Sequence, residues 1–247
     1  MNSKKISILS KGFRDYITLK TKKDTALQEE IRWLKTNDNF LFDKSVEAVE
    51  YSAVAGETAV ALADSGVCSS IISTDDETSS YINKKLENSK QKNISLFREH
   101  VDLGGGFYGS PSNGGKWKTI FLNDVLPFMS YDSDLVCVLI SLKTIITHDG
   151  LVVFRLYKPS WFQSDVVVEQ RKQKHLFVLE YDRIRHRNFD LKFSYSCGKT
   201  RCRDNIMLTA WEKNDVITCI KSIKGWYIDK KTLQNNEDFV CCRPVKC

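Results

Sequence analysis

Apolar runs alternate with amphipathic segments between residues 23 and 157. Runs rich in Val, Ile and other strand-forming residues end in small or acidic residues and predict strands at 46–52, 68–74, 93–97, 119–122 and 151–157. The segments 23–35, 57–65, 79–89 and 135–146 have the composition and spacing of helices. Strands and helices that alternate in this way favour a mostly parallel, doubly wound α/β sheet with helices on both faces.

The pattern changes after residue 157. Two strand-like runs, 189–195 and 205–211, flank a polar turn at 196–204 and predict an antiparallel hairpin that closes an edge of the sheet. Residues 212–247 add strand-like pieces whose place the pattern does not determine. Because no repeat or linker divides the chain, we expect 1–247 to form one domain. Its expected parts are an N-terminal helical segment (1–44), a core (45–212) and a Cys-rich C-terminal extension (213–247).

Composition and charge narrow the class of protein only slightly. The chain of 247 residues is 42% hydrophobic and 28% charged with a net charge of +6, which suits a globular domain and permits a phosphate-rich partner. We find no apolar stretch typical of a signal peptide or membrane span, so we expect a cytoplasmic protein without a membrane segment. Six of the eight cysteines lie beyond residue 196 at spacings unlike those of zinc sites, so we expect free thiols and no metal.

The turn after the first predicted strand has the small residues of a nucleotide-binding turn. Ligands of open α/β sheets bind outside the carboxyl ends of the strands where the strand order reverses, and the backbone there must approach the ligand closely. The turn reads EYSAVAG over residues 50–56 and resembles the class I methyltransferase signature E-x-G-x-G-x-G, with Ser52 and Val54 in place of two glycines. The resemblance implies that S-adenosylmethionine is bound by Ser52, Ala53, Val54 and Gly56.

Acidic residues follow the next three predicted strands. Asp75 stands about 20 residues after the turn, where an acid can accept hydrogen bonds from ribose hydroxyls, and Asp76 competes for that role. Asp102 would meet the adenine edge, and Asp124, beside Val125, stands where catalytic or methionine-binding groups lie in this fold. A single acid at a strand end more often caps a helix. Three acids in this order favour a cofactor site.

Further segments resemble the FtsJ-type ribose 2′-O-methyltransferases, in particular the coronavirus-like nidovirus cap enzymes. Residues 23–34 (KDTALQEEIRWL) are similar to that family's first helix, K-x-T-x-L-x-x-x-L-x-x-L, and 116–124 (KWKTIFLND) to its strand K-W-D-L-I-x-S-D. Residues 149–155 (DGLVVFR) resemble G-G-x-x-x-x-K, followed by a Ser-Trp pair at 160–161. The resemblance implies a Rossmann-like fold, RNA (capped RNA included) as methyl acceptor, room for an activating protein subunit and, for a viral protein, the host cytoplasm as location.

The same resemblance implies a catalytic set. Lys23 would deprotonate or orient the ribose hydroxyl, Asp124 would position that lysine, Arg155 would be the second cation and Asp204 the final acid. Arg155 stands where the family has lysine, and Asp204 where it has glutamate. Because arginine keeps its proton at neutral pH, Arg155 could bind a phosphate or carboxylate but could not act as a base.

Two other functions stay open. Residues 100–104 (HVDLG) and the glycine-rich stretch up to Pro111 also resemble bacterial class I enzymes that methylate saccharides or other small molecules. The replaced glycines and the altered catalytic set would also suit a methyltransferase fold that serves as a binding module. RNA methylation predicts salt-sensitive RNA binding, since phosphate contacts release counterions. Small-molecule methylation predicts indifference to RNA, and a binding module predicts failure to bind S-adenosylmethionine.

Overall fold

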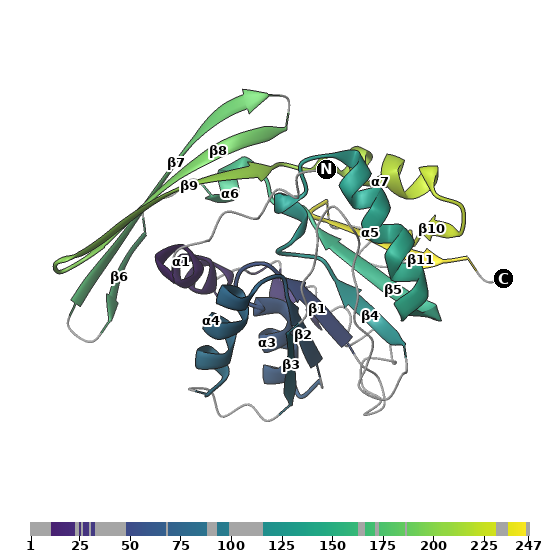
Figure 1. Ribbon diagram of the computed structural model, residues 1–247, viewed down its shortest axis with the longest axis horizontal. Helices are drawn as coiled ribbons and strands as arrows, with labels where there is room; N and C mark the ends of the chain where they lie inside the picture. Colours follow the sequence, from purple (N-terminus) through teal and green to yellow (C-terminus); the bar gives the residue numbers. More distant parts are fainter. Residues whose placement is uncertain are drawn as a thin grey trace.

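A seven-stranded sheet forms the centre of the protein (Figure 1), with the strand order β10-β11-β5-β4-β1-β2-β3. The computed structural model describes residues 11–22, 25, 27–29, 31–32, 48–67, 69–87, 93–98, 116–162, 166–170, 173–185, 187–230 and 237–245. The strands of the main sheet are β1 (Ala48–Ser52), β2 (Ser69–Ser73), β3 (Ile94–Arg98), β4 (Trp117–Phe121), β5 (Ile146–Arg155), β10 (Trp226–Ile228) and β11 (Phe239–Pro244).

The first five strands run parallel, and their order reverses between β1 and β4. From β1 the sheet continues through β2 to β3 on one side and through β4 to β5 on the other. Strand β11 is antiparallel to both β5 and β10 and so forms an antiparallel edge hairpin with β10. The predicted mostly parallel, doubly wound sheet is therefore confirmed, and its antiparallel edge hairpin is formed by β10 and β11 and not by the predicted runs 189–195 and 205–211.

Helices cover both faces of this sheet because consecutive strand residues are buried on opposite sides. Val49 and Tyr51 of β1 share a buried cluster with Leu135 and with residues of α7, whereas Ala48 shares one with Leu62. The helices whose whole length lies within the described residues are α1 (Lys11–Lys22), α3 (Glu57–Asp64), α4 (Asp76–Glu87), α5 (Asp132–Ile145), α6 (Pro159–Phe162) and α7 (Lys213–Ser222), with a 3₁₀ turn η2 (Leu126–Phe128). Within the described residues, no helix is both long and apolar enough to cross a membrane.

A second, four-stranded antiparallel sheet projects from the body on the side of α1 (Figure 1). It consists of β6 (Val166–Gln170), β7 (Gln173–Arg185), β8 (Asn188–Cys197) and β9 (Thr200–Thr209). The prediction that 189–195 and 205–211 pair is correct, but their placement at the edge of the main sheet is wrong. These strands form a separate sheet because their buried side chains pack on α1. The centres of the Phe193 and Phe13 rings lie 5.4 Å apart in an edge-to-face arrangement.

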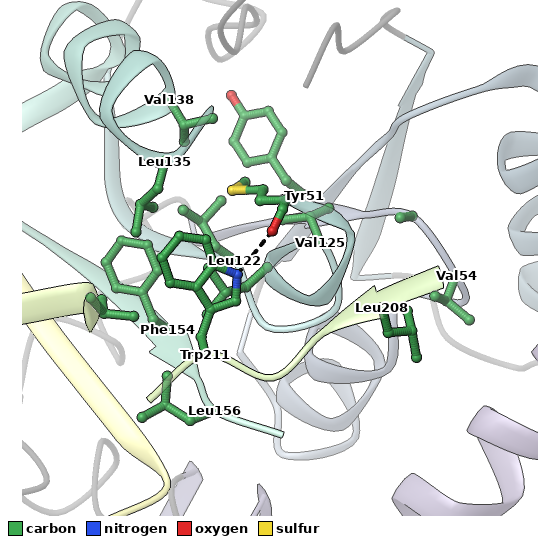
Figure 2. Packing of buried hydrophobic residues seen from close by; sticks show 14 of the residues in the cluster. Tyr51, Val54, Leu122, Val125, Leu135, Val138, Phe154, Leu156, Leu208 and Trp211 are labelled. Atoms are coloured by element: carbon green, nitrogen blue, oxygen red, sulfur yellow. Dashed lines mark hydrogen bonds between the residues drawn. The ribbon is translucent and has the colours of Figure 1, made fainter. Parts of the chain in front are cut away.

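The indole of Trp211 ties this second sheet to the main core just after β9 ends. It packs with Leu122, Leu135 and Phe154 (Figure 2), and its Nε1 donates a hydrogen bond to Met129 O at 3.1 Å. Leu208 of β9 belongs to the same buried cluster as Val54 of the turn after β1. The second sheet therefore reaches the carboxyl ends of the main-sheet strands.

The start of β5 differs from the one that the sequence predicts. Residues 147–150, between the predicted helix 135–146 and the predicted strand 151–157, lie inside β5, which begins at Ile146. A Cβ on Gly150 would lie 3.0 Å from Lys118 O and would collide with Ile146, so glycine lets β5 pass close to β4. In the predicted helix 23–35, the described residues are helical, and Leu27 and Ile31 are buried against the sheet.

Candidate cofactor-binding site

The turn from β1 into α3 lies where the strand order reverses, which is the place where open α/β sheets bind ligands. Gly56 ends this turn with a φ of 64°, in the left-handed region that favours glycine. A Cβ at this position would also lie 2.7 Å from Ile71 Cδ1 of β2. The left-handed backbone conformation therefore favours glycine here, and a larger residue would also have to displace the Ile71 side chain.

Asp124, just beyond β4, holds the turn with its buried carboxylate. Ser52 Oγ donates to Asp124 Oδ2 at 2.7 Å, and the backbone N–H groups of Ala53 and Ala55 donate to the same carboxylate at 3.1 and 3.4 Å. Ser52 Oγ in turn accepts from Gly56 N at 2.8 Å. Burial raises the pKa of Asp124, and the hydrogen bonds from Ser52 and the turn oppose that rise. The serine that replaces a motif glycine thus joins β1, the turn and β4.

A second buried carboxyl group lies at the start of α3. Glu50 Oε2 accepts a hydrogen bond from Ala59 N at 2.8 Å, and Asn123 Nδ2 donates to Thr58 Oγ1 at 2.9 Å. Burial, reinforced by the nearby charge of Asp124, raises the pKa of Glu50 well above its ordinary value. Glu50 is therefore neutral over a wider pH range than an exposed glutamate, and it satisfies backbone donors of the first helical turn.

Asp75 follows β2 and combines helix capping with access to solvent. Its Oδ1 accepts from Thr78 N at 2.7 Å, which caps α4, and its side chain is 32% exposed. Thr78 Oγ1 lies 2.7 Å from Asp75 Oδ2 and 3.2 Å from Ala53 O, so it links this carboxylate to the turn after β1. Asp76, its competitor in the sequence, is the first residue of α4 and is exposed.

Arg14 of α1 is a site residue that sequence reasoning missed. Its Nη1 donates to the carbonyl oxygens of Ala53 and Val54 at 3.1 and 2.7 Å, and its Nη2 lies 3.9 Å from Asp75 Oδ1. Burial lowers the pKa of Arg14, while the charges of Asp75 and Asp124 oppose this effect. The one sign of this role in the sequence is the position of Arg14, which lies between the apolar residues Phe13 and Ile17. This position places it on the buried side of a short helix.

Arg155 ends β5 among aromatic rings. Its guanidinium lies 4.7 Å from the centre of the Tyr157 ring, 6.0 Å from that of Trp161 and 5.8 Å from that of Phe239. Lys20 of α1 lies 5.2 Å from the centre of the Trp161 ring. The two cations therefore make cation–π contacts with Tyr157 and Trp161, which lie at the carboxyl end of β5 and are partly exposed.

The structure brings together most of the predicted cofactor residues and divides the implied catalytic set. Ser52, Ala53, Val54, Gly56, Asp75 and Asp124 lie at one rim, connected by the hydrogen bonds described above. Val125 is fully buried in the main apolar cluster, where it packs on the core. Asp204 lies within β9, opposite Phe193, so it does not precede a strand of the main sheet as the resemblance implies. Lys23 and Asp102 lie outside the described residues.

Known proteins resemble this chain in fold and not in sequence. No family model matches it, and neither does any curated protein sequence. Among solved structures, the sugar N-methyltransferase KedS8 from a Streptoalloteichus species is similar with a TM-score of 0.71 at 12% identity. This match covers 99% of the present chain and 97% of that chain.

Two further structures give the same result. The S-adenosylmethionine-bound amino pentose methyltransferase CalS10 from Micromonospora echinaspora has a TM-score of 0.63 at 10% identity, over 90% of this chain and 91% of that one. An S-adenosylmethionine-dependent methyltransferase from Clostridium acetobutylicum has a TM-score of 0.61 at 12% identity, over 91% and 93% of the two chains. The chain therefore has the fold of the class I S-adenosylmethionine-dependent methyltransferases.

We expect Ser52→Ala to destabilise the protein by about 1–3 kcal/mol, because the buried Asp124 carboxylate loses a donor and Gly56 N loses its acceptor. Ser52→Gly, which restores one of the two glycines replaced in the class I methyltransferase signature, should destabilise by a similar amount or more. The measurement is urea unfolding at neutral pH, with the exposed Ser160→Ala as control. Stability equal to that of the unaltered protein in both Ser52 variants would contradict the role of the hydroxyl.

Glu50→Gln should change how stability depends on pH. Because the pKa of Glu50 is raised in the folded protein, the unfolded chain releases this proton first, and the free energy of unfolding falls as pH rises above the ordinary pKa range of glutamate. The glutamine side chain of the variant does not titrate and can still accept from Ala59 N. The variant should therefore gain stability relative to the unaltered protein as pH rises. Parallel stability–pH curves from chemical unfolding would show that Glu50 is not held neutral.

Proposed function

We propose that the protein is an S-adenosylmethionine-dependent methyltransferase that acts on a small molecule, with a saccharide as the favoured acceptor class. One observation carries the cofactor assignment. The turn after β1, Asp75 after β2 and Asp124 after β4 meet at the point where the strand order reverses: Ser52 and Ala53 donate directly to Asp124, and Thr78 links Asp75 to the turn. The similar solved structures, which bind or depend on this cofactor, support the same assignment.

The residues at this rim fit the parts of the cofactor. The partly exposed Asp75 carboxylate can accept hydrogen bonds from ribose hydroxyls, and the small residues Ala53 and Ala55 let the backbone approach a ligand closely. Bound S-adenosylmethionine would supply a methyl group on a positively charged sulfur, ready for transfer to a nucleophile. The chain's own contribution would be to hold that group in line with the acceptor.

Two observations favour a small acceptor over RNA. The similar structures include methyltransferases of sugars and of glycopeptides. In addition, the catalytic set that the RNA resemblance implies is divided, since Asp204 lies in the second sheet. The rings of Tyr157 and Trp161, at the carboxyl end of β5, would offer a surface for the apolar face of a sugar ring.

Asp75→Asn tests the cofactor site. Asparagine also caps helices well, so α4 should stay folded, but the loss of charge should weaken S-adenosylmethionine binding by roughly ten- to a hundredfold. Titration calorimetry measures this, with Asp76→Asn as the matched control one residue further along the chain. Equal affinity in Asp75→Asn and the unaltered protein would remove Asp75 from the site. No binding by the unaltered protein, even at millimolar ligand, would favour the binding-module alternative.

The acceptor class is tested by transfer of a radiolabelled methyl group. We expect label in amino sugars or hydroxylated sugar nucleotides, no label in capped RNA, and little change in rate between about 50 and 200 mM salt, since few phosphate contacts are needed. Label in capped RNA, with a rate that falls steeply over that salt range, would contradict the proposal and restore ribose methylation.

A further inference from the structure

Two carboxyl groups lie buried next to the turn after β1. Glu50 of β1 is 1% exposed and Asp124 is 9% exposed. Within the described part of the chain, the hydrogen bonds to these carboxyl groups come from the Ser52 hydroxyl and from backbone N–H groups, and neither group forms an ion pair. Two buried like charges without a paired cation are costly, because both lose water and they repel each other. The pair therefore holds one negative charge and one proton more easily than two negative charges.

The hydrogen bonds decide which of the two groups keeps the proton. Asp124 accepts from Ser52 Oγ and from the N–H groups of Ala53 and Ala55, and these three donors stabilise its charged form. Glu50 is more completely buried and lies in the field of that charge. Both effects raise the pKa of Glu50 well above its ordinary value. The proton of the pair therefore belongs to Glu50.

The charged groups on neighbouring helices leave this arrangement in place. Glu57 of α3 adds a further negative charge near Glu50, and Lys85 of α4 pairs with Glu57. Arg14 of α1 is attracted by the charge of Asp124, but its Nη1 donates to two carbonyl oxygens of the turn. Both cations are thus engaged with other acceptors while the pair of carboxyl groups holds its single proton.

The position of Glu50 also suits its charged form once a cation is near. Its Oε2 already accepts from Ala59 N at 2.8 Å, in the first turn of α3, and the start of a helix favours a negative charge. S-adenosylmethionine carries two positive charges, on its sulfur and on its amino group, and the proposed site brings them to the rim beside Asp124. Glu50 can therefore ionise without any change in its hydrogen bond to α3.

We propose that binding of the cofactor releases a proton from Glu50, because the positive charges of the cofactor offset the charge of Asp124. The inference rests on the proposed function, since the same site must hold the cofactor. Only the O–H bond of the carboxyl group breaks: its electron pair stays on the carboxylate, and the proton passes to the buffer. Because binding releases a proton, affinity rises with pH until Glu50 is ionised in the free protein as well.

The test is titration calorimetry with S-adenosylmethionine in phosphate and in imidazole buffer, whose enthalpies of ionisation differ. At about pH 6.5 the amino group of the cofactor stays protonated, so a difference between the buffers reports protons from the protein. We expect the unaltered protein to release roughly 0.5 to 1 proton, and its affinity to rise roughly three- to tenfold between about pH 6 and 7.

Two comparisons assign the proton to Glu50 and its release to the charge of the ligand. Glu50→Gln should release no proton and bind with an affinity independent of pH. The matched control is Glu77→Gln, an exposed glutamate on α4, which should behave like the unaltered protein. The neutral fragment 5′-methylthioadenosine, which lacks both positive charges, should bind to the unaltered protein without releasing a proton.

The outcomes separate the inference from the proposed function. Equal proton release in Glu50→Gln and the unaltered protein, or equal release with the neutral fragment, would overturn the inference and leave the proposed function in place. If Glu50→Gln did not fold, the unaltered protein would still decide, because equal enthalpies in both buffers would overturn the inference. If the unaltered protein bound no S-adenosylmethionine, the proposed function itself would fail, and the inference with it.

Discussion

The buried carboxylate of Asp124 is the contact on which the candidate site depends. It accepts hydrogen bonds from Ser52 Oγ and from two backbone N–H groups of the turn, and so it fixes the turn after β1 against the end of β4. A buried charge is costly unless donors surround it, so this arrangement persists only while the turn keeps its present shape. The left-handed conformation of Gly56 and the hydroxyl of Ser52 help to keep the turn in that shape.

The second sheet extends this constraint to the other side of the rim. It packs on α1 through Phe193 and on the main core through Trp211, and α1 carries Arg14 to the carbonyl oxygens of the turn. Figure 1 shows α1 beside this sheet and near α4, the helix that Asp75 caps. The rim is therefore formed by residues far apart in the sequence, which meet because two sheets share one apolar cluster.

The order of the main sheet and much of the rim could be predicted from the sequence, because both follow from local patterns. Each parallel strand ends in residues that must lie at the same edge, so Gly56, Asp75 and Asp124 were predictable. The position of β8 and β9 was not, because a strand pattern shows which face is buried but not what buries it. Arg14 was missed for a related reason: its role depends on packing between α1 and a sheet more than 150 residues away in the chain. The FtsJ-type resemblance placed Asp204 before a core strand because 205–208 has a core-strand composition, yet it belongs to β9.

The most direct test of this account is a crystal structure of the chain with S-adenosylhomocysteine, the product form of the cofactor. We expect the ribose hydroxyls within hydrogen-bond distance of the Asp75 carboxylate, the amino-acid end beside the carbonyl oxygens of Ala53 and Val54, and the turn unchanged. A ligand bound at another edge of the sheet, or a turn that must break its bonds to Asp124 to admit the ligand, would contradict the account.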